Sequence, residues 1–301
     1  MNPEELMYVG SLWEEYFPKE IFFPQDTRLT PIIMFRDFFS DKGKALLPAA
    51  FAQKRVYFNV QELNEGLPFP DFEANLRTRP AEVMGCVGLA LSLIAKQRSP
   101  YATVPFLIRP RFFALTGDLC FGDLKSSCVG QLVSLRGHVV RVGACRPLIE
   151  RAAFRCAKCL NACFTRFEDG IFLPPAQCAT PKCYNKFLEL DRGSVTTSDF
   201  QRVKLTELDD IDAESARVPR SVEVEVRGSL VNTCVAGDVL CVVGVVRALQ
   251  TDAPKGAGKG KGYKESGLYT LYVLANSLLC LKGSGDRGTS KPIARSGTGA
   301  G

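Results

Sequence analysis

The chain has 301 residues, a formal net charge of +6, twelve cysteines and a single histidine, His138. One histidine excludes most catalytic and metal sites that are built on this residue type. An apolar fraction of 46% beside 23% charged residues excludes a disordered chain, and the length predicts two or three compact units.

Nothing in the sequence predicts secretion or insertion into a membrane. The N-terminal residues 1–5 are acidic and are not followed by the apolar stretch of a signal peptide. The longest apolar run, residues 83–95, is shorter than the roughly 20 residues that cross a bilayer. We therefore expect a soluble, intracellular protein, in which clustered reduced cysteines more often bind metal than form disulfides.

The first hundred or so residues predict mainly helices. Apolar residues recur at helical spacing over residues 6–16, and Thr30-Pro31 predicts the N-cap and first position of a second helix. Residues 56–60 alternate like a short strand, and residues 81–96 predict a core helix. We expect these helices to pack on one another through their aromatic side chains.

From about residue 128 the hydrophobic period changes to two, which is typical of strands. Residues 129–142 predict a strand with glycine at its middle, and three further strands are expected at 222–226, 239–246 and 268–281. Several strands separated by glycine-rich turns indicate a small barrel. The tail from residue 283 has the composition of a flexible linker.

Four cysteines have the spacing of a zinc site. Cys156 and Cys159 form one close pair, and Cys178 and Cys183 form a second pair after 18 intervening residues. Two such knuckles can hold one tetrahedral Zn²⁺, and four thiolate ligands leave no open position, so the metal is expected to be structural rather than catalytic. Two alternatives stay open: the cysteines are buried free thiols, or Cys163 replaces one ligand.

Signatures of an enzyme are absent from the sequence. The phosphate-binding pattern Gly-x4-Gly-Lys-Ser/Thr fits neither residues 256–263 nor Gly283, where Thr289 stands in the place of the lysine. A zinc deaminase needs a His-x-Glu motif, whereas His138 is followed by valines. We expect His138 to be structural and this chain itself not to be an enzyme.

Positive charge is concentrated in two segments. Residues 130–155 carry five arginines against the single carboxylate of Glu150, and four lysines lie among glycines in residues 254–264. A glycine-lysine hairpin tip between two strands is suited to contacting phosphates. The alternative is an ordinary solvated loop. The candidate phosphate-contacting lysines are Lys255, Lys259, Lys261 and Lys264.

Several motifs together resemble the N-terminal region of the minichromosome maintenance (MCM) DNA helicases. The resemblance covers roughly residues 120–282 in the correct order. It is carried by Val133-Ser-Leu-Arg-Gly-His-Val-Val-Arg-Val142, Ala153-Phe-Arg-Cys156, Asp199-Phe-Gln-Arg-Val-Lys-Leu-Thr-Glu207 and Val235-Ala-Gly-Asp-Val239. The four-residue gap in the second cysteine pair is most similar to the eighth paralogous subfamily, which acts with the ninth in recombination repair.

The resemblance implies an α+β chain of three parts. A helical bundle would occupy residues 1–120, an OB-fold barrel residues 121–155 and 184–282, and a zinc ribbon inserted in the barrel residues 156–183. A hairpin at about 247–268 would enter the ring channel. Residues 283–301 would be a linker toward an absent ATP-hydrolysing motor domain, where ATP and Mg²⁺ bind.

The function that the resemblance implies is a DNA-binding, ring-forming collar of a nuclear helicase. Six such domains would surround single- or double-stranded DNA, as a homo-hexamer or a hetero-hexamer with the ninth paralogue. Arg136, Arg141 and Arg202 would contact single strands. The loop that relays signals to the motor would contain Lys204, Glu207, Arg217 and Arg220.

Three other functions compete with this one. The chain could be a purely structural oligomerisation domain without intrinsic DNA binding, or part of a replicative MCM subunit. A zinc-dependent nucleic-acid enzyme is disfavoured, because the site is closed and only one histidine is present.

Overall fold

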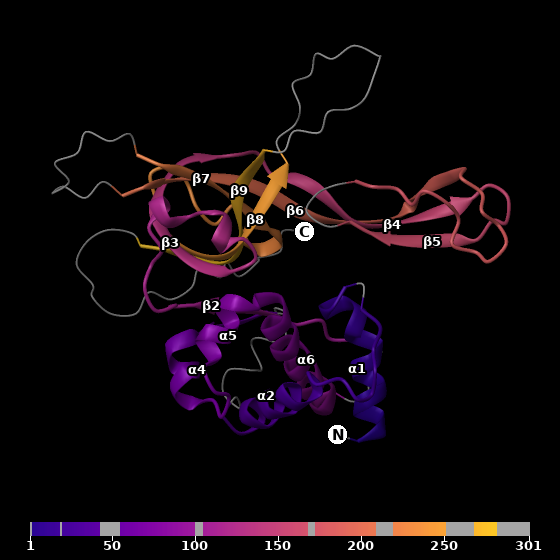
Figure 1. Ribbon diagram of the computed structural model, residues 1–301, viewed down its shortest axis with the longest axis horizontal. Coiled ribbons are helices and arrows are strands. Elements are labelled where there is room, and N and C mark those ends of the chain that lie inside the picture. The colour runs from indigo at the N-terminus through magenta and orange to yellow at the C-terminus, as the bar shows by residue number, and fades with distance from the viewer. Residues whose placement is uncertain are drawn as a thin grey trace, which may run out of the picture.

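The computed structural model shows a helical domain beside a β-barrel from which a long arm projects (Figure 1). It describes residues 2–18, 20–42, 55–99, 105–167, 172–208, 219–250 and 268–281. The expected linker at 283–301 and the tip of the expected channel hairpin therefore lie outside the described residues. The helical domain and barrel together confirm the α+β class and the expected small barrel.

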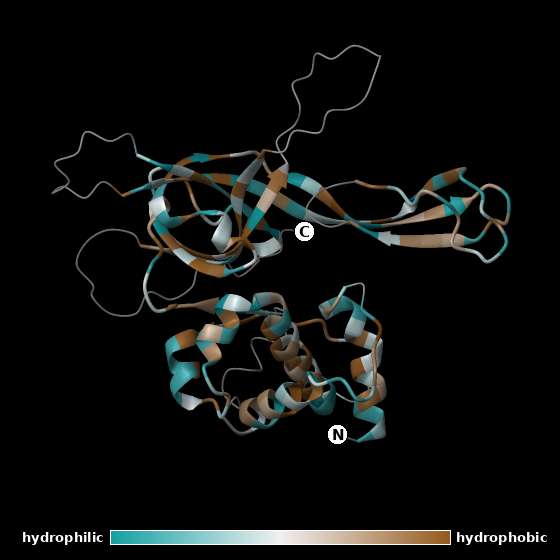
Figure 2. Ribbon diagram, in the orientation of Figure 1, coloured by the Kyte–Doolittle hydropathy of each residue, from teal (hydrophilic) through white to brown (hydrophobic). Residues whose placement is uncertain are grey.

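The helical domain packs around one buried helix. Its helices are α1 (Pro3–Tyr16), α2 (Leu29–Lys42), α4 (Val60–Gly66), α5 (Phe72–Thr78) and α6 (Pro80–Arg98). Every residue from Val87 to Ala95 on α6 is buried, and Figure 2 shows its hydrophobic colouring among the other helices. Trp13 on α1 is 1% exposed and contacts Phe17 and Phe22, which agrees with the expected packing role.

Two local details differ from the sequence prediction. Helix α2 begins at Leu29, so Thr30 lies inside it rather than at the N-cap, and the amide of Ile32 donates to the carbonyl of Arg28. A parallel strand pair, β1 (Arg55–Asn59) and β2 (Arg109–Phe113), closes the domain, and β2 had no sequence signal. Among the described residues no single helix is long and apolar enough to cross a membrane; only the bent pair α5 and α6 meets that length and composition.

Five strands close into the barrel. They pair in the order β3, β8, β9, β7, β6, and an additional β6–β3 pairing closes the ring. The β7–β9 pair is parallel and the others are antiparallel. A five-stranded closed barrel of this kind is an OB-fold. The strands are β3 (Leu132–Val142), β6 (Leu188–Glu207), β7 (Ser221–Arg227), β8 (Val239–Gln250) and β9 (Tyr269–Cys280).

The arm is inserted between the first two barrel strands. It consists of β4 (Arg146–Cys156), β5 (Ala162–Arg166) and the half of β6 that pairs with β4, and Figure 1 shows it extending away from the barrel. Its buried apolar cluster contains only Ala152, Phe154 and Phe167 among the described residues. Because β4 pairs with β5 and with β6, it belongs to the arm. The inserted arm therefore begins at Arg146, before the first cysteine of the metal-spaced pairs.

The helical domain contacts both the barrel and the arm. The Asn276 side chain on β9 accepts a 2.7 Å hydrogen bond from the Phe112 amide, and the Ser277 hydroxyl donates to the Phe112 carbonyl. The carboxylate of Glu15 on α1 forms ion pairs with Arg151 and Arg166 of the arm. The three parts are therefore held in a defined arrangement.

Closure of the barrel explains the glycine in the middle of β3. A Cβ added at Gly137 would lie 2.5 Å from the carbonyl oxygen of Thr206 on β6. We expect Gly137→Ala to lower the free energy of unfolding by about 1–3 kcal/mol, because backbone atoms of a paired strand must shift. Urea denaturation measures this cost. Gly193→Ala is the control, since its nearest contact is an ordinary 3.5 Å, and an equal loss in both variants would contradict the prediction.

Candidate metal centre and nucleic-acid interface

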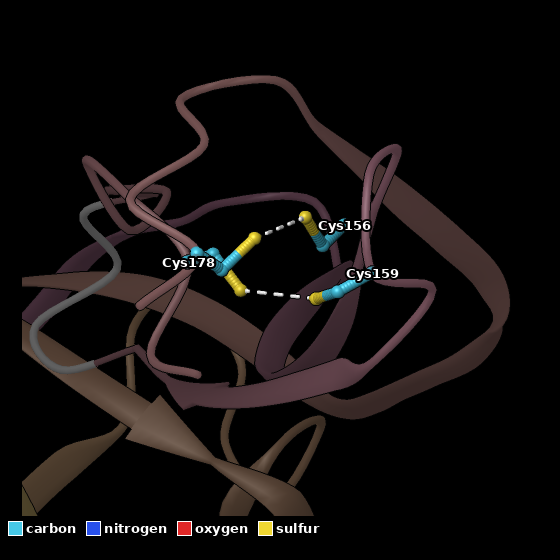
Figure 3. A group of neighbouring side chains, drawn as sticks. Cys156, Cys159 and Cys178 are labelled. Carbon is cyan, nitrogen blue, oxygen red and sulfur yellow. Dashed lines mark hydrogen bonds between the residues drawn. The ribbon is translucent and has the colours of Figure 1, made fainter. Parts of the chain in front are cut away.

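Four cysteine thiols converge at the outer end of the arm. The Sγ atoms of Cys156, Cys159, Cys178 and Cys183 all lie within 4.8 Å of one another. Cys156 Sγ is 3.7 Å from Cys183 Sγ, and Cys159 Sγ is 3.6 Å from Cys178 Sγ. Figure 3 shows the labelled sulfurs pointing into one common space from two facing turns.

The backbone around the cysteines stabilises thiolates. The amide of Lys158 and the side-chain amide of Asn185 both donate to Cys156 Sγ, at 3.4 and 3.3 Å. Hydrogen bonds from the backbone near Cys159 and from Asn185 lower the pKa of Cys156 to about 6. A hydrogen bond with Thr180 lowers the pKa of Cys159. A backbone hydrogen bond at Asn185 lowers the pKa of Cys183, but desolvation and the neighbouring sulfurs outweigh it and raise this pKa to about 11.

The donor set fits a tetrahedral metal ion. Four thiolates bound at 2.3 Å to one Zn²⁺ would lie about 3.8 Å apart, close to the two shortest separations observed. Disulfide bonds need sulfurs about 2 Å apart, and all twelve cysteines are unpaired. Cys163 lies on β5 and is not one of the four converging thiols.

A basic groove lies where the arm leaves the barrel. Its volume is about 470 Å³, and its walls come from the end of β3, the start of β4, the C-terminal half of β6 and Glu223 on β7. Arg141 on β3 is paired in register with Lys204 on β6, and Arg146 on β4 with Phe200. The charged and aromatic residues that line the groove are Arg141, Arg146, Phe200, Arg202, Lys204 and Glu223.

Comparison with known proteins identifies the family of this barrel and arm. Residues 121–250 match the family model of the MCM OB domain. The chain is 32% identical over 244 residues to the DNA helicase MCM8 of Gallus gallus, and 38% identical over 224 residues to the probable DNA helicase MCM8 of Arabidopsis thaliana. The chain belongs to the MCM family.

The similarity to MCM8 proteins extends through the helical domain. Human DNA helicase MCM8 is 27% identical over 297 residues, which is 90% of this chain and 34% of that protein. The Gallus and Arabidopsis alignments cover 74% and 73% of this chain, and 29% and 28% of those relatives. The chain thus spans about a third of the length of the MCM8 relatives and is similar to their N-terminal region, which confirms the resemblance found from sequence.

The MCM motif residues Arg141 and Arg202 come together in the groove, but Arg136 does not. The Arg136 guanidinium lies 3.2 Å from the Asp118 carboxylate and does not line the groove. Lys255, Lys259, Lys261 and Lys264 lie outside the described residues. Contact of any of these residues with DNA stays a prediction.

Two members of the expected relay loop lie on β6, and the loop itself is not described. Lys204 lines the basic groove, and the Glu207 amide donates to the carbonyl of Arg220 at 3.0 Å. Arg220 directly precedes β7, and Arg217 lies outside the described residues. The relay role is untested by this geometry.

Sequence reasoning missed the groove as a unit. Arg146 and Phe200 each belong to a motif of the MCM resemblance, and nothing in those motifs places the two residues together. The alternation Phe200, Arg202, Lys204 was the available signal, because residues two apart on a strand share one face.

A buried carboxylate orients Arg202 in the MCM barrel. Glu225 on β7 is 4% exposed, although the Val-Glu alternation of this strand predicted an outward-facing side chain. Its Oε1 accepts hydrogen bonds from Arg202 at 3.2 and 3.3 Å, and Oε2 lies 3.5 Å from Arg227 Nη2. Two arginines therefore compensate the charge that burial would otherwise disfavour.

We expect Glu225→Gln to lower the free energy of unfolding by about 1–2 kcal/mol. The substitution removes charge-assisted hydrogen bonds, and the half-exposed position of Arg202 limits the loss. Urea denaturation measures the effect. Glu223→Gln is the matched control, since Glu223 is 54% exposed and 4.0 Å from Arg202, and its expected loss is below about 0.5 kcal/mol. Equal losses in the two variants would rule out this role of Glu225.

Proposed function

We propose that this chain is the DNA-binding and ring-assembling collar of an MCM-type, ATP-dependent DNA helicase. The observation that carries the proposal is the basic groove, which brings together cations from three strands of the barrel and arm. The helicase names of the relatives support the assignment. ATP and Mg²⁺ would act in a motor domain outside these residues, because the phosphate-binding loop motif is absent from the sequence.

The chemistry of the groove favours single-stranded DNA. Arg141, Arg146 and Lys204 are exposed and offer cations to successive phosphates. Phe200 offers an aromatic ring, and the Arg202 guanidinium lies 5.7 Å from its centroid. Single-strand binding sites combine a cationic track with aromatic rings on which bases stack, and this combination requires no particular base sequence.

A titration against salt tests DNA binding. We expect a fluorescent single-stranded oligonucleotide to bind the chain. The affinity should fall steeply between about 50 and 200 mM salt, because each phosphate contact releases a counterion. Double-stranded DNA of the same sequence gives the comparison. Absence of saturable binding at low salt would contradict DNA binding by this chain.

We propose that the four-cysteine cluster holds one structural Zn²⁺. Tetrahedral thiolate sites select zinc or iron–sulfur centres, and four ligands from two short turns are typical of structural zinc. Such an ion would tie the two turns together and would supply no open position for substrate. The arm tip would then be a zinc ribbon, the part of the fold that the sequence resemblance implies.

Exposed apolar side chains on the arm support a role in assembly. Phe164 and Phe187 are 77% and 78% exposed, and Leu160, Leu173 and Tyr184 are exposed to a similar degree. Apolar residues gathered on one exposed element mark an interaction surface. We propose that the arm contacts a neighbouring subunit in a hexamer, either of one chain or with the ninth MCM paralogue.

The same observation keeps a second candidate, a purely structural oligomerisation domain. Light scattering, with and without the equivalent domain of the ninth paralogue, combined with the DNA titration, separates the two. Hexamers that bind no DNA favour the structural role. Binding that is lost when the groove is altered favours the collar.

The cellular role is proposed from the resemblance to the eighth subfamily. We propose that the whole protein acts in the nucleus, in homologous recombination and in the repair of interstrand crosslinks and double-strand breaks. Cells that lack it should be hypersensitive to crosslinking agents and still replicate their DNA at a normal rate. A primary defect in replication would instead indicate a replicative MCM subunit.

A further inference from the structure

A second cavity lies between the helical domain, the base of the arm and the barrel. Its volume is about 490 Å³, within the range of ligand sites. It is separate from the basic groove, with which it shares no lining residue. Five cations from distant parts of the chain line it: Arg28, Arg109, Arg166, Arg227 and Arg247.

The carboxylates of the cavity compensate only part of this charge. Glu20 is paired with Arg28 at 2.5 Å, and Arg28 also pairs with Asp26. Glu82 lies 3.8 Å from Arg79, which is outside the cavity. Glu150 is the remaining carboxylate among the described lining residues. The described lining therefore holds five arginines and three carboxylates. Glu15 and Glu225, which are outside this lining, also pair with Arg166 and Arg227.

Arg227 provides the clearest sign of an incomplete site. Its Nε and Nη2 atoms are buried and make no hydrogen bond within the described part of the chain. Nη2 lies 3.5 Å from Glu225, whose other oxygen is bonded to Arg202. Buried guanidinium donors without acceptors are costly, so Arg227, which lines the cavity, has hydrogen-bonding capacity that the described residues leave unused.

Arg166 and Arg109 are two further cations that line this cavity. Burial, together with the charges of Arg151 and Arg109, lowers the pKa of Arg166 although Glu15 opposes the shift. Arg109 is exposed on β2 and its guanidinium forms no ion pair among the described residues. Cations held close together repel one another, and a bound anion would relieve the repulsion.

We propose that this cavity binds a phosphate group through Arg109, Arg166 and Arg227. Guanidinium groups bind phosphate oxygens with two parallel hydrogen bonds, and several arginines can surround the tetrahedral anion. The ligand is either a free phosphate compound or one phosphodiester of a nucleic acid. Since the arginines come from the helical domain, the arm and the barrel, the bound phosphate also joins these three parts.

Isothermal titration of the intact chain with inorganic pyrophosphate, at constant ionic strength, tests the site. We expect saturable binding at one site per chain, weakened about tenfold by Arg227→Gln or by Arg109→Gln. Arg192→Gln is the control, because Arg192 is exposed on the arm and does not line the cavity. Circular dichroism establishes whether each variant is folded. Arg109→Gln is expected to fold normally, because Arg109 is exposed.

Two results would overturn the proposal: no saturable binding by the natural sequence, or unchanged affinity in Arg109→Gln. A single-stranded oligonucleotide then distinguishes the sources of phosphate. If it displaces pyrophosphate and loses affinity in Arg109→Gln, the ligand is a phosphodiester. If pyrophosphate stays bound in its presence, the ligand is a free phosphate compound. Substitutions at Arg141 and Lys204 should leave pyrophosphate binding unchanged, so failure of the DNA groove does not affect this test.

Discussion

Replacing Cys156 with serine is expected to abolish metal binding and to unfold the outer end of the arm. Cys156 is fully buried and its Sγ accepts hydrogen bonds from the Lys158 amide and the Asn185 side chain, so its loss removes one of the four converging ligands. The buried apolar cluster of the arm contains only Ala152, Phe154 and Phe167 among the described residues, too little to fold this segment alone. Binding of a structural zinc supplies on the order of 10 kcal/mol in comparable small domains.

Metal analysis and limited proteolysis measure the two effects. We expect one zinc per chain in the natural sequence and almost none in Cys156→Ser, with new cleavage within the arm and an intact helical domain. Cys163→Ser is the matched control, since Cys163 lies on the same arm outside the four-thiol cluster and should keep its metal. Full metal content in Cys156→Ser would refute the site.

Reversing the charge of Arg141 and Lys204 together is expected to weaken single-strand binding on the order of 100-fold, because two phosphate contacts become repulsive. The slope of log affinity against log salt should fall by about 1.4, the contribution of two phosphates of a single strand. These residues are register partners on β3 and β6, and both are exposed, so the substitutions remove charge without disturbing the barrel core. Fluorescence anisotropy over a salt series measures both quantities.

The control for the groove carries the same change in net charge elsewhere. Arg79→Glu with Lys125→Glu alters two exposed residues, 71% and 69% accessible, that do not line the groove. We expect its affinity to change less than threefold, or roughly 0.6 kcal/mol. If both double variants lose affinity equally, DNA is attracted by overall charge and the groove is not the binding site.

The convergence of the four cysteines was predictable from sequence because its information is local. Two short turns place their cysteines close together whatever surrounds them, and the structure adds only that both turns face one another. Cys163 shows the limit of this reasoning. Its proximity in sequence made it a candidate, whereas its position on β5 directs it to a different place from the four thiols.

The groove and Glu225 were not predictable in the same way. Alternation indicates which residues of a strand share a face, but not which strand lies beside it. Barrel closure pairs β3 with β6, and this pairing places Arg141 next to Lys204 although 62 residues separate them in the sequence. Burial of the Glu225 charge is tolerated because Arg202 and Arg227 flank it, a fact that no pattern on β7 contains.

The sequence by itself determined the long core helix, four of the barrel strands, the four metal-spaced cysteines and the family, since each of these depends on spacing along the chain. Only the tertiary structure decided which charges act together. The basic groove joins three strands, and the arginine cavity joins residues from Arg28 to Arg247. The physical reason is that electrostatic energy depends on distance in space, and closure of the barrel against the helical domain sets those distances.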